Sequence, residues 1–236
     1  MELFPERVLA NLREVRNRIA AAAGRSGRSF HDVRLVAVTK TVGEDIVRLL
    51  AAAGQKDLGE NRAQQLRDRA AALADLRVDW HMIGRLQRKN AKYVVPAAAM
   101  IHSVDSVGLA EEIGRRAVAL TGRDGRTAPM PCLLEVNSGE EQKAGVEPTE
   151  APAAARAIAA TPGISLVGLM TMAPLDADPE AARPAFAALR ELLAQINREA
   201  AVPQPLTELS MGMTQDYEVA IEEGATIVRV GTALFR

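Results

Sequence analysis

The feature that most constrains the fold of this chain is an eightfold alternation of short apolar runs with alanine-rich amphipathic stretches. Short β-branched runs separated by helical patterns are typical of successive βα units, which build parallel sheets. From Lys40 to Gly231 the units average about 27 residues, close to the ~31 residues per unit of a (β/α)₈ barrel. The runs predict strands at Arg34–Thr39, Lys56–Gly59, Asp79–Ile83, Met100–Ser103, Pro131–Val136, Ile164–Thr171, Leu206–Ser210 and Thr226–Val230.

This repeat predicts an α/β fold, a single (β/α)₈ TIM barrel over residues 1–236 with no second β domain. An open doubly wound sheet is the alternative, but that fold often carries a glycine-rich turn after its first strand, and none follows the first run here. Apolar residues at three- and four-residue spacing predict an extra helix over Leu3–Ala23, packed outside the repeat. The sequence stops soon after the eighth run, so we expect the last helix to be short or absent.

The composition argues against several classes of partner. The net charge is −1 with acids and bases interspersed, which gives no electrostatic footprint for nucleic acid or an anionic membrane. With no long apolar stretch, no signal peptide and one cysteine, Cys132, the chain is expected to be cytoplasmic with an inert core thiol. We also expect a monomer. Only three histidines are present, so we expect no metal site.

Candidate functional residues lie where the predicted strands end, because barrel enzymes build their sites on that face. Alternation places Val36, Val38 and Lys40 on the same inward face. Lys40 is one of five lysines beside 24 arginines, and arginine cannot form an imine. We expect a partly desolvated amine that can attack a carbonyl. The other polar strand ends are Glu60, Asn61, His81, Ser103, Asp105, Asn137, Thr171, Ser210, Gly231 and Thr232.

A second signal is the run Ser210-Met211-Gly212-Met213-Thr214, which follows the seventh strand and precedes a helical stretch beginning near Gln215. Its glycine lets the backbone approach a ligand, and its N–H groups and hydroxyls could cradle a phosphate. The alternative interpretation is a helix N-cap by Thr214.

In the eighth strand, alternation turns Arg229 and Gly231 inward. A buried arginine needs a permanent partner, which could be a phosphate, a ring nitrogen or an inward acid such as Glu208. Phosphate sites in barrels often follow strands seven and eight, and closure places strand eight beside strand one. The residues therefore indicate a ligand with a carbonyl at one end and a phosphate at the other, either pyridoxal phosphate or a sugar phosphate.

Several motifs, taken together, resemble the pyridoxal-phosphate homeostasis proteins, which are related to the barrel domain of alanine racemase. The resemblance implies that Lys40 holds pyridoxal 5'-phosphate as an internal aldimine and that Ser210, Gly231 and Thr232 bind its phosphate. It also implies that Arg229 faces the pyridine nitrogen, with Asn61 near the ring. The motifs are Leu35-Val36-Ala37-Val38-Thr39-Lys40, Gly59-Glu60-Asn61, His81-Met82-Ile83-Gly84 with Leu86-Gln87, Gly168-Leu169-Met170-Thr171-Met172, Ser210-Met211-Gly212-Met213-Thr214 and Val228-Arg229-Val230-Gly231-Thr232.

Two segments depart from the resemblance or extend it. The family usually has asparagine before lysine where this chain has Lys89-Asn90, so neither residue is carried into the site. The loop from Asn137 to Gly145 is a candidate lid over the mouth of the barrel. His81 lies beside Trp80 and Met82 and is expected to be a hydrogen-bonded structural residue.

The resemblance implies a non-catalytic carrier or regulator of vitamin B6 and of amino-acid and keto-acid balance. Its implied partners are apoenzymes that require pyridoxal 5'-phosphate (PLP). A racemase needs two opposed acid-base groups, and the only tyrosines, Tyr93 and Tyr217, fall in helical stretches. A cation such as Arg229 at the pyridine nitrogen also weakens the ring as an electron sink. No catalytic residue is therefore predicted, and a weak PLP-dependent racemase or a Schiff-base aldolase remains the alternative.

Overall fold

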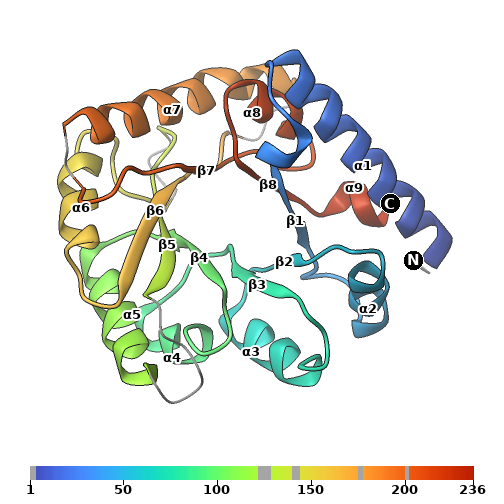
Figure 1. The fold of residues 1–236 in the computed structure, drawn as a ribbon, viewed down its shortest axis with the longest axis horizontal. Coiled ribbons are helices and arrows are strands. Elements are labelled where there is room, and N and C mark those ends of the chain that lie inside the picture. The colour runs from blue at the N-terminus through green and yellow to red at the C-terminus, as the bar shows by residue number, and fades with distance from the viewer. Residues whose placement is uncertain (1–3, 122–128, 140–143, 175–177, 200–201) are drawn as a thin grey trace.

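The fold is a closed barrel of eight parallel strands, in which each strand pairs with the next and β8 pairs with β1 (Figure 1). The computed structural model describes residues 4–121, 129–139, 144–174, 178–199 and 202–236. Closure through β1 and β8 confirms the predicted barrel and excludes the open sheet. The strands are β1 (Arg34–Val38), β2 (Asp57–Glu60), β3 (Asp79–Met82), β4 (Met100–Val104), β5 (Met130–Glu135), β6 (Ile164–Met170), β7 (Glu208–Ser210) and β8 (Ile227–Val230).

Helices surround the barrel on its outside (Figure 1). None of the helices in the described ranges has both the length and the apolar character that a membrane span needs. The α-helices are α1 (Pro5–Arg25), α2 (Glu44–Ala52), α3 (Ala63–Ala72), α4 (Ala91–Val94), α5 (Val107–Leu120), α6 (Ala151–Ala159), α7 (Arg183–Arg198), α8 (Tyr217–Glu222) and α9 (Thr232–Phe235). Short 3₁₀ turns are η1 (Phe30–Asp32), η2 (Arg88–Asn90) and η3 (Pro179–Ala182).

Two layers of apolar side chains fill the fold. Leu35 and Ala37 of β1 belong to the large outer core between the strands and the helices. Val36 and Val38 belong to a smaller cluster inside the barrel. The alternation predicted for the first strand is therefore confirmed, and it directs the next residue of the inner column, Lys40, to the mouth of the barrel. Cys132 is buried in the outer core, as predicted, and burial raises the pKa of its thiol.

The extra N-terminal helix exists and packs outside the repeat, against α8 and α9 (Figure 1). Its buried stripe is Val8, Leu12, Val15, Ile19, Ala22 and Ala23. It begins at Pro5, a residue suited to the first turn because proline has no N–H to leave unpaired. The Asn11 amide donates to the carbonyl oxygens of Leu234 at 3.2 Å and Arg236 at 2.8 Å, which ties α1 to the residues that follow β8.

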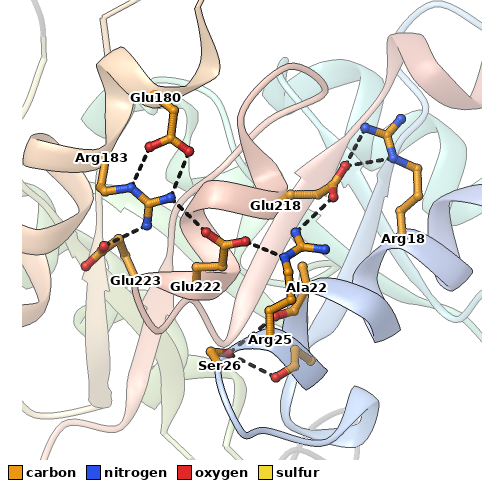
Figure 2. Close-up of polar contacts among 10 residues, drawn as sticks. Arg18, Ala22, Arg25, Ser26, Glu180, Arg183, Glu218, Glu222 and Glu223 are labelled. Carbon is orange, nitrogen blue, oxygen red and sulfur yellow. Dashed lines mark hydrogen bonds and ion pairs between the residues drawn. The ribbon is translucent and has the colours of Figure 1, made fainter.

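An ion-pair network links α1 to α8, and it also links α8 to α7 (Figure 2). Arg18 donates to Glu218 at 2.7 Å, and Arg25 donates to Glu222 at 2.6 Å. Arg183 continues the network by donating to the other carboxylate oxygen of Glu222 at 2.7 Å. A single exposed ion pair contributes little stability, partly because ordering its two side chains costs entropy. In a network, one ordered side chain takes part in several ion pairs, so this cost is smaller for each pair.

Candidate functional site: the cavity at the mouth of the barrel

A cavity of about 740 Å³ opens at the carboxyl ends of the strands. This volume lies within the range of small-molecule and cofactor sites. Five of the six predicted cofactor residues contribute to its wall, and Ser210 does not. The five are Lys40, Asn61, Arg229, Gly231 and Thr232. A neighbouring groove of about 750 Å³, between α2 and α3, shares Lys40 and Asn61.

Lys40 lies two residues beyond Val38, the last residue of β1, and its side chain is exposed. The prediction of a partly desolvated amine is therefore wrong for this structure. The reason is geometric: the apolar column ends at Val38, and Lys40 lies in the loop that both the cavity and the neighbouring groove reach. Its backbone is nevertheless held, because the Gln65 amide donates to the Lys40 carbonyl at 3.0 Å.

A buried acid and a nearly buried base fix the loop that carries Lys40. The Glu60 carboxylate accepts from the Thr39 hydroxyl and from Arg69, each at 2.6 Å. Arg69 also donates to the carbonyl oxygens of Thr39 and Val42. Burial raises the pKa of Glu60, opposed by the hydrogen bond from Thr39 and the charge of Arg69. The sequence indicated Glu60 only as a polar strand end, because its partner lies on the following helix.

Arg229 points inward from β8 and is only 4% exposed. Its guanidinium donates to the Ser210 hydroxyl at 2.6 Å and to the Thr171 carbonyl at 2.9 Å. Burial lowers the pKa of Arg229 to about 10, against the charges of Glu135 and Asp216, so it stays protonated at neutral pH. The alternative ion pair with Glu208 is wrong: that carboxylate accepts from the Thr226 hydroxyl at 2.7 Å.

Ser210 lies deeper than a phosphate cradle at the mouth would require. Its side chain is fully buried, and its hydroxyl contacts Arg229 and His102 inside the barrel. Ser210 is accordingly not among the residues that line the cavity.

Gly212 has a packing role in this structure. Its φ of +91° favours glycine, and a Cβ there would come within 2.6 Å of Ala220 in α8. The missing side chain therefore lets the loop pack against α8, whereas the sequence suggested a close approach to a ligand.

Thr214 faces the turn after β8 and does not cap α8, so the N-cap interpretation is wrong. The residue before α8 is Asp216, whose carboxylate accepts from the Met213 N–H at 2.6 Å. The Thr214 hydroxyl accepts from the N–H groups of Gly231 and Ala233 at 3.4 Å each. These contacts are long for N–H···O bonds, which centre near 2.9–3.0 Å. Thr214, Gly231 and Thr232 thus place weakly engaged polar groups together on the cavity wall.

His81 is hydrogen-bonded and buried, as predicted. Its Nε2 lies 3.0 Å from an Asp57 carboxylate oxygen, and its Nδ1 lies 2.9 Å from Nε2 of His102. The second histidine could not be found from the sequence as a partner, because it comes from the next strand.

Glu135 is a cavity residue that the sequence analysis missed. It ends β5, is 3% exposed, and its Oε2 has no hydrogen-bond partner among the described residues. Burial and, next, the charge of Asp105 raise the pKa of Glu135 to about 7, against the charges of Arg229 and Arg85. The sequence pattern could have indicated Glu135 as an inward residue, because alternation in the fifth run puts it on the same face as Leu133.

The remaining sequence candidates lie elsewhere or outside the described residues. Lys89 and Asn90 form part of η2, away from the cavity wall, in agreement with their omission from the site. Tyr93 lies on α4 and Tyr217 is buried in α8. The central part of the candidate lid, residues 140–143, lies outside the described residues, and Ala144 beside it contributes to the cavity wall.

Comparison with known proteins gives concordant matches along the chain. The family described as alanine racemase, N-terminal domain, matches residues 10–236. The pyridoxal phosphate homeostasis protein of Aquifex aeolicus is 43% identical over 225 residues, which covers 95% of each chain. A structure described as an unknown protein from Bifidobacterium adolescentis superposes with a TM-score of 0.89 at 39% identity, over 98% of this chain and 95% of that one. PipY of Synechococcus elongatus, solved with PLP bound, has a TM-score of 0.82 at 33% identity, over 97% of this chain and all of that one.

Proposed function

Because this chain belongs to the alanine racemase N-terminal domain family and to the pyridoxal phosphate homeostasis proteins, we propose that it binds pyridoxal 5'-phosphate at the barrel mouth. The observation that carries the proposal is that one cavity is lined by a lysine, a buried arginine and a glycine-threonine turn. Of the two ligand classes that the sequence left open, PLP is favoured because the related PipY was solved with PLP bound.

The residues that line the cavity are each given a proposed role in binding PLP. Lys40 supplies the amine that holds the aldehyde carbon of the cofactor covalently, and Asn61 lies beside the ring. Gly231 and Thr232 bind the phosphate through their N–H and hydroxyl groups, and the loose contacts of Thr214 favour adding it to this set. A bound PLP supplies an electrophilic carbon and an electron-withdrawing ring.

Arg229 and Ser210 act together in this proposal. Arg229 is buried, protonated and within the cavity wall, which suits a contact with the pyridine nitrogen. Ser210 remains a predicted phosphate ligand, but its present contacts favour a role behind Arg229.

The chain is proposed to act as a carrier or regulator that sequesters the cofactor and passes it to apoenzymes. The names of the curated relatives, homeostasis proteins, support this class of role. A protonated Arg229 at the ring nitrogen disfavours ring protonation and so weakens carbanion stabilisation. Neither Tyr93 nor Tyr217 contributes to the cavity wall as an opposed acid-base group.

A weak PLP-dependent racemase is the second candidate, and Glu135 is the observation that favours it. A carboxyl group with a pKa of about 7 in the cavity can exchange a proton near neutral pH. Exchange of the α-deuterium of alanine separates the two functions. A carrier should exchange no faster than free PLP, whereas a racemase should exchange faster and lose that advantage in Glu135→Gln.

The binding site itself is tested by borohydride reduction of the protein with PLP, followed by peptide mapping. The pyridoxyl group should be found on Lys40 and should be lost, with the imine absorption band, in Lys40→Ala. Lys56→Ala is the matched control, because Lys56 is an exposed lysine at the opposite end of the barrel. An adduct that remains in Lys40→Ala and maps stably to Lys89 or Lys143 would refute the proposed site.

A further inference from the structure

A line of four hydrogen bonds crosses the interior of the barrel and ends at Arg229. Nη1 of Arg229 lies 2.6 Å from the Ser210 hydroxyl, and that hydroxyl lies 2.8 Å from Nδ1 of His102. Nε2 of His102 lies 2.9 Å from Nδ1 of His81, and Nε2 of His81 lies 3.0 Å from an Asp57 oxygen. Asp57 begins β2 at the opposite end of the barrel from the cavity.

The groups from Arg229 to His81 are almost completely removed from solvent, whereas the Asp57 side chain is 23% exposed. His102 and Ser210 are 0% exposed, His81 is 1% exposed and Arg229 is 4% exposed. An unsatisfied polar hydrogen in such an interior costs about 1–3 kcal/mol, so the arrangement of protons that satisfies every group is strongly favoured. The partners at the two ends determine that arrangement.

The proton positions follow from the two ends of the line. A guanidinium can only donate, so the Ser210 oxygen accepts from Arg229. A carboxylate only accepts, so His81 carries its proton on Nε2 and leaves Nδ1 as an acceptor. His102 must then donate from Nε2 to His81 and accept at Nδ1 from the Ser210 hydroxyl. Both imidazoles are neutral, and each hydrogen bond runs in the same direction, from Arg229 to Asp57.

If the hydrogen bonds from His81 through His102 to Ser210 ran in the opposite direction, the hydrogen of the Ser210 hydroxyl would lose its acceptor in this line. If His81 were doubly protonated, His102 would donate to Ser210 from Nδ1. The Ser210 oxygen would then accept from both His102 and Arg229, and its own hydrogen would have neither as an acceptor. Burial is the largest cause that holds the pKa of His102 well below its usual range, and the charges of Arg229 and Arg34 act in the same direction, in agreement with a neutral ring. Arg229 lies at one end of the line, near the charges of Glu135 and Asp216, and the Asp57–Arg34 pair lies at the other, with its atoms 3.7 Å apart.

We propose that His102 is a positioning residue for Arg229, because it holds the Ser210 hydroxyl in the acceptor orientation through a one-way hydrogen-bond relay anchored at Asp57. Ser210 and Thr171 each take one donor of the guanidinium, which fixes its plane and leaves its other N–H groups for a ligand. The proposal rests on the proposed function in one respect, that Arg229 faces the cofactor. The relay itself belongs to the ligand-free protein.

The proton positions can be measured directly in the full chain without any ligand. With ¹⁵N-labelled histidine at pH 7, His81 and His102 should each show a single proton, on Nε2. His31, the third histidine, is exposed and serves as the solvated reference. A proton on Nδ1 of His102, or a doubly protonated ring at either buried position, would overturn the relay.

A pair of substitutions of similar size tests the effect on Arg229. His102→Asn keeps an acceptor beside the Ser210 hydroxyl, whereas His102→Leu removes it. The slowly exchanging Nη protons of Arg229 should persist in His102→Asn and disappear in His102→Leu. The dissociation constant for PLP should rise about tenfold in His102→Leu, equal to about 1.4 kcal/mol, and less than threefold in His102→Asn. His31→Leu should change neither readout.

The outcomes separate this proposal from the proposed function. Equal behaviour of the Asn and Leu variants would refute positioning by the acceptor, since a packing role alone would not favour Asn. Failure of the unmutated protein to bind PLP would refute the proposed function, while the histidine protons and the Arg229 exchange would still decide the relay. If His102→Leu does not fold, the proton positions in the unmutated protein and the Arg229 exchange in His102→Asn decide it.

Discussion

Glu135→Gln should stabilise the protein at alkaline pH and leave its stability almost unchanged at acid pH. Burial, and then the charge of Asp105, raise the pKa of Glu135 to about 7 in the folded chain, whereas an unperturbed glutamate titrates near ~4.3. The folded state therefore binds this proton more tightly than the unfolded state. The stability that the proton provides is complete below about pH 4 and is lost as the pH rises through 7.

The size of the effect follows from the pKa difference. Each pKa unit corresponds to about 1.36 kcal/mol, so the ionised carboxylate lowers the free energy of unfolding by about 4 kcal/mol above pH 8. Glutamine has nearly the same shape and cannot ionise, so the variant avoids this loss. For a chain of this size, about 4 kcal/mol corresponds to a rise in melting temperature of about 8–16 °C.

The assay is thermal unfolding of Glu135→Gln and the unmutated protein at pH 4.5 and pH 8, without ligand. The melting temperatures should differ at pH 8 and nearly coincide at pH 4.5. Glu6→Gln, an exposed position at the start of α1, is the control and should show no difference at either pH. An equal shift at both pH values, or a lower melting temperature of Glu135→Gln at pH 8, would refute the assignment of Glu135 as a buried carboxyl with a raised pKa.

Two further predictions concern the cavity wall and the loop that carries Lys40. PLP at 100 times its dissociation constant should stabilise the protein by about 2.7 kcal/mol, and it should raise the melting temperature more than unphosphorylated pyridoxal does. Thr232→Ala should reduce the difference between the two ligands. Equal stabilisation of the unmutated protein by both ligands would exclude the phosphate contacts. Arg69→Met should lower the free energy of unfolding by about 3–5 kcal/mol, because it leaves the buried Glu60 carboxylate without its cation. In urea unfolding, Arg69→Met,Glu60→Gln should recover part of that loss, and a double variant less stable than Arg69→Met alone would contradict the buried pair.

The barrel could be predicted from the sequence because each strand carries its own signal. A short β-branched run in a parallel sheet is apolar on both faces, and its length and spacing are local properties. The predicted strand ends differ from the observed ones by a residue or two, as at Leu206, because pairing with the neighbouring strand sets where a ladder stops. The inward faces of Val36, Val38 and Arg229 also followed from alternation alone.

The partners of the inward polar residues could not be predicted in the same way. Alternation gives the direction of a side chain but not its depth, so Ser210 was expected at the mouth and lies in the interior. The sequence offered a phosphate, a ring nitrogen or an acid as the partner of Arg229, and its contacts within the protein are a hydroxyl and a carbonyl. The link from His81 to His102 joins residues 21 apart in the sequence and depends on how far strands stagger around the barrel.

The seam between β1 and β8 has a consequence for how the protein is made. Lys40 follows β1, whereas Arg229 belongs to β8 and Gly231 and Thr232 follow it, so the two sides of the cavity come from early and late in the chain. During synthesis β1 is made long before β8, so it emerges while the strand that pairs with it does not yet exist. A nascent or truncated chain would therefore carry the reactive lysine without the opposite wall. Ligand binding would begin only with barrel closure, and the cofactor would then favour the completed fold by mass action.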